Sequence, residues 1–204
     1  MKKNMVPTAA MFAAVLALAV YSPALAAQES AGASADAHAQ AKGQMKKGEV
    51  SEYDRHFVEE TASGGMLEVE LGKMVSEKSQ SADVKAFAQH MVADHSKANE
   101  QLKTLATSKG IAIPKELQAE HRAKRDQLAK LSGEELDQRY MDLMVKGHED
   151  TVTKFEHETR QGSDDDIKQF AKDTLPTLRE HLAQAQKVDK ETDAAASADD
   201  NRTP

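Results

Sequence analysis

The feature that most constrains this chain is a helical stripe of apolar residues with a histidine at its centre. Between residues 84 and 105, apolar side chains recur every three or four positions, which is the spacing of one face of an α-helix. His95 lies in the middle of this face, and a second stripe, from Met141 to Phe155, has His148 at its centre. Such stripes pack onto other helices, so the sequence predicts a helical bundle with polar residues inside it.

The first 26 residues have the pattern of an export signal. Lys2 and Lys3 form a basic start, and the apolar run over residues 9–20 is too short to span a membrane comfortably. Ala24-Leu25-Ala26 is a small-residue cleavage site. We therefore expect residues 1–26 to be a signal peptide that is removed on export, and the protein to be periplasmic.

Charge and composition narrow the class of partner and of fold. Loss of Lys2 and Lys3 shifts the formal net charge from −7 to −9, and an acidic chain has no electrostatic attraction to nucleic acid or anionic lipid. The chain has no tryptophan and aromatic residues make up 4%, which favours helices over a sheet. It has no cysteine, so neither a disulfide nor lipid attachment at a cysteine is available. We expect no nucleic-acid partner and no transmembrane helix in the mature chain. An envelope protein or a second copy of the chain remains as the class of partner.

Cap residues and helix breakers divide the remaining sequence. Residues 27–50 lack an apolar face and are expected to form a flexible leader, and residues 189–204 a disordered tail. The bundle domain is predicted over residues 51–188, with helices at 51–79, 81–110, 115–131, 132–162 and 163–188. The expected helix starts are a cap at Ser51 with Asp54, a cap at Ser81, a capping box from Ser132 to Glu135, and a cap at Ser163 with Asp166.

The third helix is short and highly charged, and it is long enough to return along the bundle. The fourth helix then runs parallel to the second, as in ferritin-like bundles. We therefore predict an all-α fold, a ferritin-like four-helix bundle with a shorter charged crossover helix between the second and third long helices. An up-down-up-down bundle fits the same periodicities if the third helix folds aside. Gly64 and Gly65 each cost about 1 kcal/mol of helix propensity, which the close approach of a neighbouring backbone would offset. Pro176 is expected to kink the last helix.

Each of the four long helices places one ionisable residue on its apolar stripe: Glu68, His95, His148 and His181. Three imidazoles and a carboxylate converging in a dry interior would be a competent ligand set for zinc, iron or copper. The same four residues would also form a packing network without a metal, if they bonded to each other or to a water molecule. Both interpretations stay open at this point.

The neighbouring residues exclude some classes of site. Di-iron bundles carry a Glu-x-x-His pair on each of two helices, whereas Val92, Val145 and Leu178 stand three residues before the three histidines. Met91 and Met144 precede His95 and His148 by four residues and would suit copper, although methionines on a stripe usually fill the core. Asp94, Glu149 and Glu180 point about 100° away from the stripes and are expected to be solvated. No catalytic residue is predicted.

Three strings in the chain carry a resemblance to a known family: residues 57–72, 84–95 and 175–182. Over roughly residues 53–188 the chain resembles the exported bacterial family "domain of unknown function 4142". The resemblance implies a ferritin-like bundle behind a signal peptide, in a periplasmic or outer-membrane protein, and the family's glutamate and histidine positions match Glu68, His95, His148 and His181. The expected function is metal binding in the core, with a role in envelope stress or metal handling. The alternative is a non-catalytic structural or interaction module.

Overall fold

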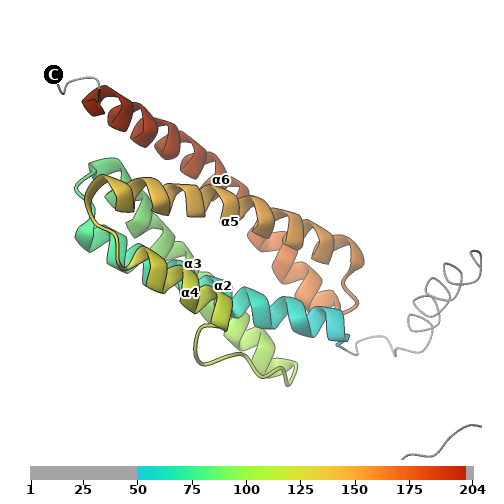
Figure 1. The fold of residues 1–204 in the computed structure, drawn as a ribbon. Helices are drawn as coiled ribbons and strands as arrows, with labels where there is room; N and C mark the ends of the chain where they lie inside the picture. The colour runs from blue at the N-terminus through green and yellow to red at the C-terminus, as the bar shows by residue number, and fades with distance from the viewer. Residues whose placement is uncertain (1–49, 201–204) are drawn as a thin grey trace, which may run out of the picture. The chain divides into compact units, whose positions relative to one another are not determined.

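The computed structural model describes residues 50–200, so the predicted signal peptide and nearly all of the predicted leader lie outside the described residues. The described part of the chain forms helices without any strand (Figure 1). The prediction of an all-α fold is confirmed. The helices are α2 (Glu52–Lys78), α3 (Ala82–Ser108), α4 (Ala119–Leu128), α5 (Gly133–Gln161) and α6 (Asp165–Asp200).

Two of the predicted helix starts have the expected hydrogen bonds. At the start of α2, the Ser51 hydroxyl accepts from the Asp54 N–H at 3.0 Å, and the Asp54 carboxylate accepts from the Ser51 N–H at 3.0 Å. At the start of α3, the Ser81 hydroxyl accepts from the Val84 N–H at 3.3 Å. These side chains satisfy N–H groups that a helix cannot satisfy internally.

The other two helix starts differ from the prediction. The capping box from Ser132 is wrong, because Ser132 makes no side-chain cap bond and the left-handed backbone of Gly133 (φ +59°) redirects the chain there. The cap of α6 is Asp164 rather than Ser163, since its carboxylate accepts from the N–H groups of Asp166 at 3.0 Å and Ile167 at 3.1 Å. At its far end α6 continues to Asp200, past the expected start of the tail. The domain boundary at residue 188 stays a prediction.

The short helix α4 carries the chain back along α2 (Figure 1). At one end the Gln118 N–H donates to the Ser63 hydroxyl at 2.9 Å, and at the other the Lys78 ammonium group donates to the Ala129 carbonyl at 2.9 Å. The bond to Ser63 holds Gln118 just outside the helix, so α4 begins four residues later than expected. The return places the start of α5 beside the start of α3.

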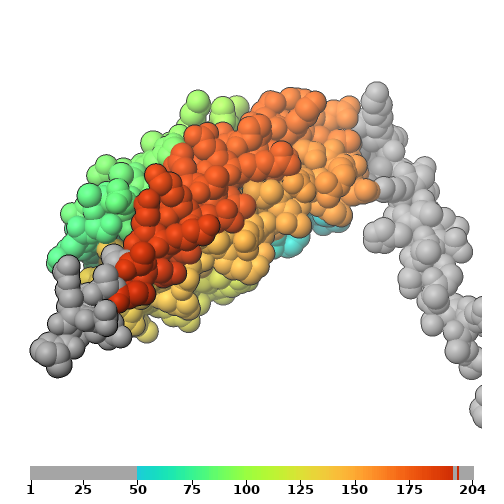
Figure 2. Space-filling model, turned by 90° about the horizontal axis from the view of Figure 1, so that it is seen from above, coloured from blue at the N-terminus to red at the C-terminus, as the bar shows by residue number. Residues whose placement is uncertain are grey.

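The long helices therefore have the predicted ferritin-like connectivity. Helix α5 runs parallel to α3, because Phe87 meets Tyr140 near the starts of the two helices and His95 meets His148 near their middles, with ring centroids 6.1 Å and 5.7 Å apart. Helix α2 pairs with α3, and α5 pairs with α6. Figure 2 shows α6 along one face of the bundle, flanked by α3 and α5.

The core consists of two apolar clusters at different levels along the bundle. One contains Leu71, Phe87, Met91 and Met144, and the other contains residues such as Phe57, Leu102 and Phe155. Along α3 and α5, the first cluster ends one turn before His95 and His148, and the second begins about two turns after them. The histidines therefore lie between two layers of hydrophobic packing.

At Gly72, helix α2 lies directly against the backbone of α3. A Cβ atom built there would lie 2.8 Å from the Ala88 carbonyl oxygen and 2.7 Å from a methyl group of Val92. The Gly64-Gly65 pair, where we expected this approach, meets only side chains, and the nearest atom to a Cβ at Gly64 is 3.8 Å away, in His121. The close backbone approach thus falls about two turns further along α2.

We expect Gly72→Ala to lower the free energy of unfolding by about 1–3 kcal/mol, because the new methyl group must push α3 away despite the better helix propensity of alanine. The matched control, Gly64→Ala, should raise stability by up to about 1 kcal/mol, since its methyl group meets only an ordinary contact. Urea unfolding followed by circular dichroism measures both. Equal effects of the two substitutions would contradict the close approach.

Buried carboxyl groups join the start of α2 to the turn between α5 and α6. Asp54 is fully buried, and its carboxylate accepts from the N–H groups of Ser163 at 2.8 Å and Asp164 at 3.2 Å. Glu158 is also fully buried, and its carboxyl oxygens meet no donor among residues 50–200. Burial, and then the negative charge of Asp54, raise the pKa of Glu158 to about 8. Glu158 therefore keeps its proton in the folded protein at neutral pH.

This raised pKa makes stability depend on pH. In the unfolded chain Glu158 loses its proton near pH 4.5, whereas in the folded protein it keeps it to about pH 8, so the stability it contributes is lost as pH rises across this window. Glu158→Gln cannot ionise, and between pH 5 and pH 9 it should gain about 1–3 kcal/mol relative to the wild-type protein. Urea unfolding at several pH values measures the difference. Glu149→Gln, on the exposed face of the same helix, is the control; parallel curves for Glu158→Gln and wild type would contradict the argument.

Candidate metal centre

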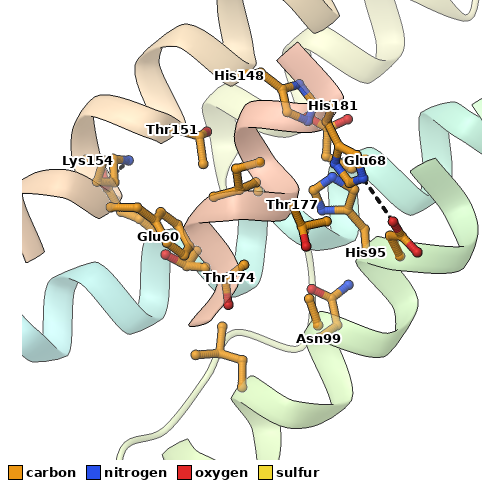
Figure 3. A pocket seen from close by; sticks show the side chains of 18 of the residues that line it. Glu60, Glu68, His95, Asn99, His148, Thr151, Lys154, Thr174, Thr177 and His181 are labelled. Carbon is orange, nitrogen blue, oxygen red and sulfur yellow. Dashed lines mark hydrogen bonds and ion pairs between the residues drawn. The ribbon is translucent and has the colours of Figure 1, made fainter. Parts of the chain in front are cut away.

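One cavity lies at the level of the histidines. Its volume is about 110 Å³, and Glu68 from α2, His95 from α3, His148 from α5 and His181 from α6 all line it. Figure 3 shows these four side chains gathered at one end of the cavity. All four residues that the sequence singled out therefore line one cavity. Each lies on its helix near the boundary between the two apolar clusters.

The three imidazole rings are mutually close. Ring centroids are 5.7 Å apart for His95 and His148, 5.2 Å for His95 and His181, and 5.5 Å for His148 and His181. One ring nitrogen of each histidine lies within 4.8 Å of the corresponding nitrogens of the other two. Small side-chain adjustments would bring three such nitrogens around one ion at bond lengths of about 2.0–2.1 Å.

Hydrogen bonds fix which nitrogen of two rings faces the cavity. His148 is buried, and its Nδ1–H donates to the Met144 carbonyl at 2.9 Å. His181 is buried too, and its Nε2–H donates to the Asp94 carboxylate at 3.0 Å. In a neutral imidazole the other nitrogen then carries a free electron pair. These other nitrogens, His148 Nε2 and His181 Nδ1, and also His95 Nε2, are enclosed and have no hydrogen-bond partner in the described part of the chain.

Burial favours the neutral form of two of the three rings. Burial lowers the pKa of His95 to about 3, and the nearby His148 and His181 add to the effect. Burial also lowers the pKa of His181, although the hydrogen bond to Asp94 acts in the opposite direction. Near neutral pH these two rings are therefore neutral, and each has one nitrogen with a free electron pair, which is the state that a metal ion requires.

Glu68 is near the histidines but is not equivalent to them. Its Oε2 atom is enclosed and finds no hydrogen-bond donor among residues 50–200, and burial raises the pKa of the carboxyl group while His148 acts to lower it. Its oxygens do not belong to the set of donor atoms that lie within 4.8 Å of one another. The geometry thus gives three close imidazole rings and one carboxylate at a greater distance.

The rest of the cavity extends away from the histidines. Thr151 and Thr174 line its middle, and the ion pair between Lys154 and Glu60, at 2.5 Å, lies at its other end (Figure 3). A water molecule occupies about 30 Å³ in the liquid, so this space also has room for a water ligand beside an ion.

The structure corrects one prediction about the neighbours of the histidines and shows where the methionines lie. Asp94 was expected to be solvated, but it accepts a hydrogen bond from buried His181, because α6 lies on the side of α3 that Asp94 faces. Its position one residue before a stripe histidine could have suggested contact with a neighbouring helix, but only the arrangement of α3 and α6 identifies the partner. Met91 and Met144 are fully buried in an apolar cluster and fill the core.

Fold and site together define an all-helical bundle with a histidine-lined cavity at its centre. The chain belongs to the family described as "Domain of unknown function (DUF4142)", whose sequence profile matches residues 26–188. No curated protein matches the chain. Among residues 50–200, no helix combines the length and the apolar character needed to cross a membrane.

Two solved structures share the fold. A DUF305 fragment from Deinococcus radiodurans is 16% identical, with a TM-score of 0.62 over 70% of this chain and 98% of that one. A "putative secreted protein DUF305" from Streptomyces coelicolor is 13% identical, with a TM-score of 0.59 over 69% of this chain and 92% of that one. At these identities the similarity concerns the fold alone.

Proposed function

We propose that this protein binds one transition-metal ion in the core of its bundle, through His95, His148 and His181. The observation that carries the proposal is that the three rings leave one enclosed nitrogen each without a partner among the described residues, and that the rings surround one cavity. Leaving buried polar atoms unpaired costs free energy, and a cation bound by their electron pairs would remove that cost. Imidazole ligands suit zinc, iron and copper.

Two further contacts support metal binding over a packing network. Metal-binding histidines usually donate their second N–H to a carbonyl or a carboxylate, as His148 and His181 do here. Glu68 stands beside the three rings as a further ligand, or as an acceptor for a metal-bound water. In a self-sufficient network the rings would instead bond to one another.

We further propose that the protein is exported to the periplasm and acts there in metal handling or envelope stress tolerance. The signal pattern of residues 1–26 supports export. The description of the Streptomyces coelicolor structure as a "putative secreted protein" agrees with this. The proposal includes no catalytic activity.

The test is elemental analysis of the protein purified without a metal-affinity tag, followed by titration with Zn²⁺, Fe²⁺ and Cu²⁺. We expect about one ion per chain in the wild-type core and a loss of core affinity of about 100-fold or more in His148→Gln, which removes one ligand and keeps a polar side chain. His157→Gln, an exposed histidine on the same helix, is the control and should bind as the wild-type protein does.

The outcome that would contradict the proposal is equally specific. If wild type and His148→Gln bind the same amount of metal with the same affinity, the core is not the site. If neither binds metal and His148→Gln is less stable in urea unfolding, the cavity residues form a packing network. Circular dichroism of each variant shows whether it is folded.

A further inference from the structure

His181 also belongs to a second group of ligand atoms, on the outer side of its ring. His90, Asp94 and His181 each contribute one donor atom to a set in which all atoms lie within 4.8 Å of one another. The side chains of His90 and Asp94 are 38% and 36% exposed, whereas that of His181 is 2% exposed. This group, which we call the outer site, therefore opens to solvent on one side and ends at the histidine that lines the core cavity.

The distances in the outer site suit a metal ion. Asp94 Oδ2 lies 3.1 Å from His90 Nε2 and 3.0 Å from His181 Nε2. Donor atoms around a tetrahedral ion with bonds of about 2.0 Å are about 3.3 Å apart. His90 and Asp94 are one helical turn apart on α3, so they face the same direction, and His181 reaches them from α6.

The hydrogen bonds of His90 leave its Nε2 facing Asp94, where either a second proton or a metal ion fits between them. The Gln184 amide group donates from its nitrogen to Glu180 at 3.3 Å, so its oxygen faces His90 and accepts from His90 Nδ1–H at 2.9 Å. In the neutral ring, His90 Nε2 then carries an electron pair that points at the Asp94 carboxylate. Two acceptors at 3.1 Å repel each other unless a second proton or a metal ion lies between them.

We propose that His90, Asp94 and His181 form a surface metal site for divalent transition-metal ions, and that an ion bound there passes to the core cavity through His181. The transfer of the ion to the core cavity rests on the proposed function, but the outer site is argued from its own geometry. A buried metal site needs a route from solvent, and His181 offers one nitrogen to the outer site and the other to the cavity.

The transfer conserves protons on His181. A neutral imidazole has one electron pair and one N–H, so the ring holds an ion on one side at a time. With the ion on Nε2, the proton is on Nδ1 and faces the cavity. When the ion moves to Nδ1, that proton leaves to water and Nε2 takes one proton from water. Nε2 keeps this proton and shares it with Asp94 in the hydrogen bond that the structure has.

The first experiment removes the core site and asks whether the outer site remains. In His148→Gln, titration with Co²⁺ should show residual, weaker binding with its own visible absorption, and His90→Gln in the same chain should abolish it. Glutamine keeps a donor for Asp94 but is a poor ligand for these ions, so the change tests ligation rather than hydrogen bonding. If His148→Gln binds no Co²⁺, or if its residual binding survives His90→Gln, the outer site is refuted.

The second experiment leaves the core site intact. In His90→Gln alone, the core should bind Zn²⁺ with wild-type affinity at equilibrium, while stopped-flow loading and release slow by about tenfold or more. His157→Gln should load at the wild-type rate. Loading of His90→Gln at the wild-type rate would overturn transfer through the outer site.

The two proposals fail in different ways. If His148→Gln leaves wild-type binding unchanged but His90→Gln removes the bound ion, the outer site stands and the core site is wrong. If His148→Gln removes all binding and His90→Gln changes neither affinity nor rate, the core site stands and the outer site is wrong. Circular dichroism and thermal unfolding of each variant show that a loss of binding is not a loss of fold.

Discussion

The interaction on which the rest of this structure depends is the burial of imidazole rings in the middle of an otherwise apolar bundle. A polar group moved from water into such an interior costs about 1–3 kcal/mol if it is not hydrogen-bonded. Three ring nitrogens without a partner among residues 50–200 meet here. The apolar clusters on either side stabilise the helices at their two ends. The bundle therefore has two apolar cores and, between them, one polar layer whose burial costs free energy. The hydrogen bonds around that layer determine which atoms of the rings are available for binding.

Those hydrogen bonds lie on the edge of each ring that faces away from its unpaired nitrogen. The Met144 carbonyl and the Asp94 carboxylate take the outward N–H groups of His148 and His181, which turns the electron pairs of both rings inward. Burial keeps His95 neutral, so its ring also presents no charge to its neighbours at neutral pH. Burial raises the pKa of the Glu68 carboxyl group, which also lines the cavity. Several polar atoms of the cavity can therefore bind one cation or accept from one hydrogen-bond donor.

Periodicity was enough to find the helices and the residues that converge. His95 and His148 stand in the middle of three-and-four spaced stripes, and such a stripe has only one side to bury. The charged segment before Ser132 indicated a crossover, because its length matches the return path along α2. The start of α5 was less predictable, since the sequence around Gly133 fits a capping box until the left-handed backbone of Gly133 is known.

Asp94 is a residue whose contacts could not be predicted from the sequence. Its direction on α3 follows from helix geometry, but whether that direction means solvent or a neighbour depends on where α6 lies, and helix spacing carries no information about this. The same limit applies to Gly72. From the sequence alone this glycine only lowers helix propensity, whereas in the structure Ala88 and Val92 of α3 lie against it and leave no room for a side chain. Contacts between helices decide the role of residues at the edge of a stripe, whereas residues at its centre are buried in almost any bundle.

The orientation of the rings argues for a ligand more strongly than their burial does. A packing network would gain most by linking its members, since each hydrogen bond formed inside it would satisfy two buried atoms at once. Here the partners of His148 and His181 lie behind the rings, and Glu68 has a carboxylate oxygen that meets no donor within residues 50–200. The protein thus satisfies the outer edges of the two rings, and among residues 50–200 the inner nitrogens and the Glu68 oxygen have no partner. That arrangement lowers the free energy of the folded protein only when a cation or a hydrogen-bond donor lies between the inner atoms of the rings and of Glu68.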